Sequence, residues 1–222
     1  MRILFVVATA FEVSSLISDF EFRISDSGKG LYYSQLITNH SLLITGVGMV
    51  ATAFALGSEL AANDYDLAIN LGIAGSFDKN IALGELVEIT LDTLAELGAE
   101  DDEAFLPIEQ MGFGESVFAA TAKLTDIYIV KPLQQANAIT VNTVHGNEHS
   151  IQKVSDRLNP QIESMEGAAF FYACREAGVP CLQIRAVSNY VEKRNRDNWQ
   201  IGLAIKNLNN FAVEMLKGLG NG

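Results

Sequence analysis

The residues best suited to chemistry are two carboxylates, an arginine and an amide in the C-terminal half of the chain. Glu163 and Glu166 lie at the start of an apolar helical pattern. Arg185 and Asn189 lie at the end of an apolar strand pattern. Charged groups are costly to bury unless they are paired or held for a ligand, and open α/β sheets bind ligands at the carboxyl ends of their strands. This layout predicts a site for a polar small molecule at the strand ends.

Three earlier segments place further candidates just after predicted strands. Glu12 could reach a substrate there, or it could be a first-turn helix glutamate favoured by the helix dipole. Gly46 and Gly48 could present backbone amides to a polar ligand, although a tight turn would need the same glycines. Ala74 and Gly75 are small enough to let a flat ring or a ribose approach closely.

Other site chemistries are disfavoured. His145 and His149 could face one way on a helix, but Gly146 lies between them and no third ligand follows at a suitable spacing. A G-x-S-x-G nucleophile motif does not occur, and Ala51 stands where a dinucleotide fingerprint needs its third glycine. We therefore expect neither a metal nor a cofactor.

Strand and helix patterns alternate along the chain. Runs typical of buried strands cover residues 2–8, 41–45, 67–71, 86–90, 138–144 and 181–187. Helical patterns cover residues 50–62, 148–158, 166–177 and 199–217. This alternation predicts a single α/β domain over residues 1–222, with a mixed, mostly parallel central sheet flanked by helices.

Two segments depart from the alternation. Residues 31–38 and 41–45 are separated by a turn at Asn39 and His40, which predicts a hairpin. Residues 94–115 are acidic and contain Pro107, Gly112 and Gly114, which predicts a long surface loop.

Composition narrows the class of partner and the compartment. A net charge of −12 over 222 residues makes nucleic acid and anionic membrane poor partners. The apolar run at residues 2–8 is short and soon interrupted by Glu12, so we expect a buried strand rather than a secretion signal. Cys174 and Cys181 are typical of buried thiols in a reducing compartment, which predicts a cytoplasmic protein.

Several motifs in chain order carry a family resemblance. They are Glu12, residues 45–48, residues 70–75, residues 164–169 and residues 185–189. Together they resemble the nucleoside phosphorylase and nucleosidase superfamily over nearly the whole chain. This resemblance implies a nucleoside phosphorylase-like fold, a purine nucleoside as substrate and a homodimer or higher homo-oligomer.

A narrower resemblance rests on residues 141–144, 165–170 and 188–199. These segments are similar to those of futalosine hydrolases, the nucleosidases of the alternative menaquinone route. Asn189 stands where the related methylthioadenosine and adenosylhomocysteine nucleosidases have an aspartate. An asparagine amide offers both a donor and an acceptor, which matches a 6-oxopurine. We therefore expect hypoxanthine rather than adenine as the released base.

The resemblance also implies roles for individual residues. Glu12 would deprotonate the attacking water, with Arg185 helping to position it. Glu166 would bind the ribose hydroxyls, and Asn189 would hydrogen-bond the departing purine.

Four further residues are expected to contact other parts of the substrate. Val144 and Met165 would pack on the sugar and the base. Arg194 and Arg196, in the one dense basic group of an acidic chain, would lie near the carboxylate of the benzoate-bearing tail, unless they form only a solvated helix start.

Several functions compete with futalosine hydrolysis. A phosphorylase would need an anion pocket of several basic residues, and apart from Arg2 and Arg185 the strand ends are poor in lysine and arginine. A methylthioadenosine/adenosylhomocysteine or aminodeoxyfutalosine nucleosidase would share the same motifs. A non-catalytic nucleoside sensor would bind purine nucleosides but release no base.

Overall fold

The computed structural model describes residues 1–24, 31–33, 40–127 and 132–219. The strands are β1 (Ile3–Val7), β2 (Arg23–Ile24), β3 (Leu31–Tyr33), β4 (His40–Ile44), β5 (Leu67–Ser76), β6 (Leu86–Leu94), β7 (Gly98–Asp101), β8 (Ala104–Pro107), β9 (Val117–Ala119), β10 (Gln134–Thr140), β11 (Ile162–Ser164) and β12 (Cys181–Tyr190). The helices are α1 (Ser14–Asp19), α2 (Met49–Ala62), α3 (Leu124–Ile127), α4 (Glu148–Leu158), α5 (Gly167–Ala177) and α6 (Ile201–Leu219), with short 3-10 turns η1 (Ala10–Val13) and η2 (Arg196–Asn198).

In the described part of the chain, one mixed sheet of ten strands forms the centre of the fold, in the order β11-β10-β6-β12-β5-β1-β4-β3-β2 with β9 beside β6. The strands β4, β1, β5 and β12 run parallel to one another, whereas β12 and β6 are antiparallel. β11 pairs with both β10 and β5, so β5, β12, β6, β10 and β11 close into a small ring. The expected α/β fold with a mixed sheet is confirmed.

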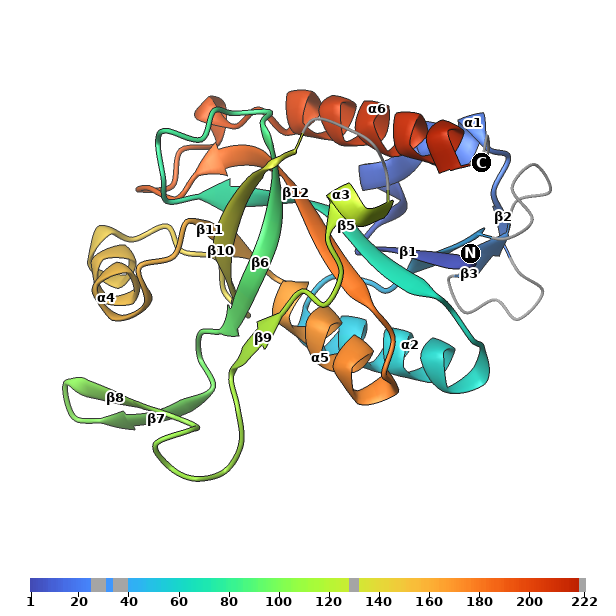
Figure 1. Cartoon of the computed structure of the whole chain (residues 1–222). Helices are drawn as coiled ribbons and strands as arrows, with labels where there is room; N and C mark the ends of the chain where they lie inside the picture. Colours follow the sequence, from blue (N-terminus) through green and yellow to red (C-terminus); the bar gives the residue numbers. More distant parts are fainter. Residues whose placement is uncertain (25–30, 34–39, 128–131, 220–222) are drawn as a thin grey trace.

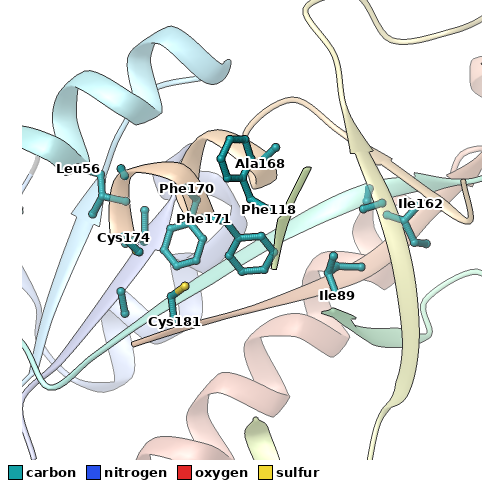
Figure 2. Close-up of a cluster of buried hydrophobic side chains, with 14 of the residues drawn as sticks. Leu56, Ile89, Phe118, Ile162, Ala168, Phe170, Phe171, Cys174 and Cys181 are labelled. Atoms are coloured by element: carbon teal, nitrogen blue, oxygen red, sulfur yellow. The ribbon is translucent and has the colours of Figure 1, made fainter. Parts of the chain in front are cut away.

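Different helices cover the two faces of the sheet: α2 and α5 lie on one, and α1 and α6 on the other (Figure 1). Successive side chains of a strand point to opposite faces. In β1, Leu4 and Val6 accordingly join the core under α2 and α5, while Phe5 joins the core under α1 and α6. Figure 2 shows Phe170 and Phe171 of α5 packed within the first of these cores.

The predicted elements match the observed ones to different degrees. The helix expected at residues 148–158 is α4, and the three other predicted helices agree with α2, α5 and α6 to within two residues. β5, β6 and β12 each extend past their predicted ends, because the small and polar residues there still pair with neighbouring strands. β10 begins at Gln134 and ends at Thr140, so the prediction of a strand over residues 138–144 is wrong for residues 141–144, which follow the observed strand.

The prediction of a long loop at residues 94–115 is wrong. This segment contains the end of β6 and the antiparallel hairpin of β7 and β8. The guanidinium carbon of Arg157, on α4, lies 3.9 Å from the centre of the Phe105 ring in β8. Phe105 and Leu106 are the apolar residues that the acidic composition obscured.

The N-terminal hairpin is confirmed where the structure describes it. β3 pairs antiparallel with β4, with Leu31 opposite Leu43, and residues 34–39 of the predicted hairpin lie outside the described residues. Cys174 and Cys181 are buried free thiols. Within the described ranges, no helix combines the length and apolar character needed to cross a bilayer.

Candidate active site

A cavity of about 410 Å³ opens at the carboxyl ends of β1, β5 and β12. It brings together eight of the residues predicted from the sequence: Glu12, Ala74, Gly75, Val144, Met165, Glu166, Asn189 and Arg194. Its other lining residues are Ala8, Thr9, Phe11, Val47, Ile73, His145, Glu163, Ser164, Ser188, Trp199 and Ile201. The wall thus combines three carboxylates with a largely apolar surface.

Glu12 is held rigidly at the edge of this cavity. It lies in η1 and is 8% exposed; one carboxylate oxygen accepts a hydrogen bond from the Thr9 backbone N at 2.9 Å, and the other accepts from the Ile73 N at 3.2 Å. Burial raises the pKa of Glu12, and the positive charge of Arg185 opposes this shift. The carboxylate belongs to the capping box of a 3-10 turn and also lines the cavity.

Arg185 lies behind Glu12 rather than in the cavity wall. It is 1% exposed, its Nε donates to Gln183 Oε1 at 2.7 Å, and its Nη2 donates to Asn70 Oδ1. No carboxylate of the described residues lies within ion-pair distance of it. A Cβ at Gly72 would lie 2.0 Å from Arg185 Nη1 and 3.2 Å from Glu12 Oε1. An effect of Arg185 on a bound water would therefore pass through Glu12.

A buried polar chain that the sequence did not reveal continues from Arg185. Gln183 Nε2 donates to Asp92 Oδ2 at 3.1 Å, and Thr140 Oγ1 donates to Asp92 Oδ1 at 2.8 Å. Thr140 Oγ1 in turn accepts from the Ala168 N in the first turn of α5. Burial raises the pKa of Asp92 to about 6, against the opposing effect of these hydrogen bonds. In the sequence, the one sign of this hydrogen-bonded network is that Asp92 interrupts the apolar residues of β6.

Glu166 occupies the N-cap position of α5, without a capping hydrogen bond from its side chain, and lines the cavity. Its Oε1 accepts from the Gly48 N at 2.9 Å, and the Gly46 N donates to the Ala8 carbonyl at 3.1 Å. Both glycines have positive φ, +88° at Gly46 and +95° at Gly48. Neither glycine lines the cavity, although Val47 between them does. The glycine turn thus positions Glu166 instead of offering free amides to a ligand.

Asn189 belongs to a row of residues that crosses three strands. It pairs with Gly75 of β5, and Gly75 pairs with Glu163 of β11. The Asn189 amide nitrogen donates to the Tyr190 carbonyl at 3.1 Å, and its oxygen accepts from Ser188 Oγ at 2.9 Å. Each amide atom retains capacity for a second hydrogen bond, so Asn189 can still offer a donor and an acceptor to a ligand.

Glu163 and His145 form a pair that the sequence analysis missed. Glu163 is 4% exposed and is neither solvated nor a helix cap. Its Oε1 accepts from the His145 backbone N at 3.0 Å, and its Oε2 pairs with the ring Nδ1 of His145. His145 lies between β10 and α4, and Glu163 lies 18 residues later in β11, so no local pattern indicates their pairing.

Of the two arginines expected near the substrate tail, Arg194 lines the cavity and Arg196 does not. The Arg194 guanidinium lies 4.9 Å from the centre of the Trp199 ring, and both residues line the cavity. The Arg196 guanidinium lies 5.7 Å from the same ring but does not line the cavity.

Comparisons with known proteins agree with this architecture. The futalosine hydrolase of Streptomyces coelicolor is 32% identical over 186 residues, which cover 81% of this chain and 79% of that protein. The Thermus thermophilus futalosine hydrolase is 30% identical over 77% of this chain and 78% of its own length. The crystal structure of a Helicobacter pylori 5'-methylthioadenosine/S-adenosylhomocysteine nucleosidase shares the fold, with a TM-score of 0.82 at 16% identity and 98% coverage of both chains.

The structure of the Helicobacter pylori futalosine hydrolase has the same fold, with a TM-score of 0.81 at 16% identity, covering 98% of this chain and 97% of that one. The family model for the phosphorylase superfamily matches residues 2–217. The chain therefore belongs to the phosphorylase superfamily and, within it, to the futalosine hydrolase family.

Proposed function

We propose that this protein is a nucleosidase that hydrolyses the N-ribosidic bond of futalosine and releases hypoxanthine, as a step of menaquinone biosynthesis. The observation that carries the proposal is one cavity that joins the buried carboxylates Glu12 and Glu166 to the neutral amide of Asn189. Carboxylates suit the sugar and the water, and the amide suits a 6-oxopurine. The futalosine hydrolases among its relatives support the same substrate.

The proposed reaction passes through a sugar cation, as glycoside hydrolysis does. Glu166 accepts hydrogen bonds from the ribose hydroxyls, and Glu12 takes a proton from the water that attacks C1′. The raised pKa of Glu12 makes its carboxylate a better proton acceptor, and its two backbone hydrogen bonds fix its orientation. Val144 and Met165 provide apolar contacts to the base and the sugar.

Water is the proposed nucleophile because the cavity offers little to phosphate. Arg194 is the one lysine or arginine among the described residues that line it. The guanidinium of Arg185 is buried and donates to Gln183 and Asn70. Phosphorylases need several cationic or amide donors around the anion. A phosphorylase activity is therefore the less favoured second candidate.

Arg194 is the proposed partner for the carboxylate of the benzoate tail, because it lines the cavity whereas Arg196 does not.

We also propose that the protein is cytoplasmic and forms a homo-oligomer. Val50 and Phe54 lie one turn apart on α2, are 78% and 77% exposed, and follow the cavity residue Val47 closely. An exposed apolar face of this kind suits an interface between copies of the chain.

A nucleoside panel tests the proposal. The purified protein is incubated separately with futalosine, aminodeoxyfutalosine, methylthioadenosine and adenosylhomocysteine, and the released bases are separated by chromatography. We expect hypoxanthine from futalosine at a kcat/KM well above that for the three 6-amino nucleosides. If adenine is released preferentially, the substrate is a 6-amino nucleoside and not futalosine. If a nucleoside binds but no base is released, the protein is a non-catalytic nucleoside sensor.

A further inference from the structure

We propose that His145, held by Glu163, is the proton donor to the departing base. This inference rests on the proposed function and adds a catalytic residue to it. It begins from a problem in the site: Asn189 can hydrogen-bond a purine, but an amide does not transfer a proton to it. When the C1′–N9 bond breaks, its electron pair enters the base, and a proton supplied at that moment makes the base a better leaving group.

The strand register places the histidine pair beside the proposed base site. Glu163, Gly75 and Asn189 are direct neighbours across β11, β5 and β12. Directly paired residues project from the same face of a sheet. The two side chains therefore flank Gly75, which has none. A Cβ at Gly75 would lie 3.2 Å from Asn189 Nδ2 and 2.9 Å from Val191 Cγ2. The missing side chain lets Asn189 pack directly against Gly75. Gly75, Asn189, Glu163 and His145 all line the same cavity, so a base held by Asn189 lies within the cavity that the histidine pair borders.

Among the described residues, the hydrogen bonds of the His145 ring use Nδ1 and leave Nε2 for the ligand. Nδ1 is bound to Glu163 Oε2, and Glu163 Oε1 accepts from the backbone N of the same histidine. An imidazolium donates through both nitrogens. His145 also lines the cavity, so Nε2 is the atom assigned to the base.

The other charged groups of the cavity are unsuited to this step. Glu12 is assigned to the water and Glu166 to the ribose. The guanidinium of Arg194 does not give up a proton in proteins. Glu163 binds His145 through both of its oxygens, which leaves His145 as the proton donor of suitable chemistry among the described residues that line the cavity.

The proposed step balances. The C1′–N9 bond breaks and its electron pair moves into the purine, which takes the proton of His145 Nε2. The oxygen of the water bonds to C1′ and its proton goes to Glu12. After the products leave, solvent returns a proton to His145 and removes one from Glu12.

A substrate that needs no proton separates this role from a structural one. N7-methylated futalosine carries a fixed positive charge on its base, so the base departs without protonation. We expect His145→Gln to lower kcat/KM for futalosine by about 100-fold or more, but to lower it for the N7-methyl substrate by less than about threefold. Glu163→Gln should show the same selectivity with a smaller loss. His149→Gln, at an exposed histidine of α4, is the matched control and should change neither value.

The outcomes are distinguishable. Equal losses on both substrates would make His145 a structural or binding residue, and unchanged kcat/KM on futalosine would remove it from the site; either result overturns the inference while leaving the nucleosidase assignment intact. A wild-type protein that releases no base from either nucleoside would overturn the proposed function and this inference together. The N7-methyl reaction also reports whether each variant is folded.

Discussion

The surroundings of Glu12 suit its carboxylate to accept a proton from water. Burial raises its pKa, while two backbone amides fix both of its oxygens. We predict that Glu12→Gln lowers kcat for futalosine by at least about 100-fold, because the amide cannot accept the proton of the water. Binding of futalosine, measured by calorimetry, should change far less. Turnover close to that of the wild type would remove Glu12 from the mechanism.

Asn189 is predicted to set the base preference. Replacing the amide by a carboxylate in Asn189→Asp leaves a 6-oxo group without its donor, and a mismatched buried polar group costs about 1 to 3 kcal/mol. The variant should therefore lose kcat/KM for futalosine and gain relative activity on aminodeoxyfutalosine. The ratio of the two kcat/KM values measures this directly. An unchanged ratio would show that Asn189 does not distinguish the two bases.

A site residue could be predicted from the sequence where it stands at the boundary of a recognisable apolar strand or helix. Glu12 and Asn189 stand just after or at the end of apolar strands, and Glu166 stands at the start of an apolar helix; the structure places all three around one cavity. His145 and Asp92 were not predicted as site or network residues. Their partners, Glu163 and Gln183, lie on other elements, and such pairings depend on topology that local sequence patterns do not contain.

At the scale of elements, the position of Arg185 depends on the close approach of β12 to β5. Gly72 of β5 is paired with Arg185, and a Cβ there would overlap the guanidinium at 2.0 Å. We predict that Gly72→Ala destabilises the protein by about 1 to 3 kcal/mol, as overpacking does, and lowers kcat by displacing Arg185 from behind Glu12.

Gly57→Ala is the matched control for this substitution. Gly57 lies within α2, and a Cβ there would have no atom within 4 Å. Alanine favours a helix over glycine by roughly 1 kcal/mol, so this variant should be slightly more stable and equally active. Urea unfolding and initial rates measure both effects. Equal stability of the two variants would contradict the close packing of Arg185 against Gly72.

The helices and strands that could be predicted from the sequence are those with a long run or a periodic pattern of apolar residues. The strands β1, β5 and β12 and the helix α4 carry enough apolar residues to be recognised, whereas β11 has only three residues and therefore shows no periodicity. β11 nevertheless carries Glu163 and closes the ring of strands. Closure is a property of pairing between distant segments, so the sequence predicted the mixed sheet but not the ring.

At the scale of the whole molecule, Asp92 couples stability to pH. Its pKa is raised from 3.8 to about 6 in the folded state, so the folded protein holds this proton more tightly than the unfolded chain. The contribution of Asp92 to the free energy of unfolding is therefore lost as the pH rises from about 4 to about 6, by about 3 kcal/mol. Asp92→Asn does not titrate and removes this dependence.

We predict that the difference in unfolding free energy between Asp92→Asn and the wild type shifts towards the variant by about 3 kcal/mol between about pH 4 and pH 7. Other carboxylates titrate in both proteins and cancel in the difference. Urea titrations at several pH values supply the measurement, with Asp101→Asn, at an exposed position of β7, as the control. A difference that does not vary with pH would show that Asp92 has an ordinary pKa.

Product analysis with and without phosphate shows whether water is the nucleophile that attacks futalosine in this cavity. We expect hypoxanthine to be released at the same rate in a phosphate-free buffer and in added phosphate, with the free ribosyl compound as the other product. A ribose 1-phosphate product whose yield rises with phosphate, or no release of hypoxanthine at all, would contradict it.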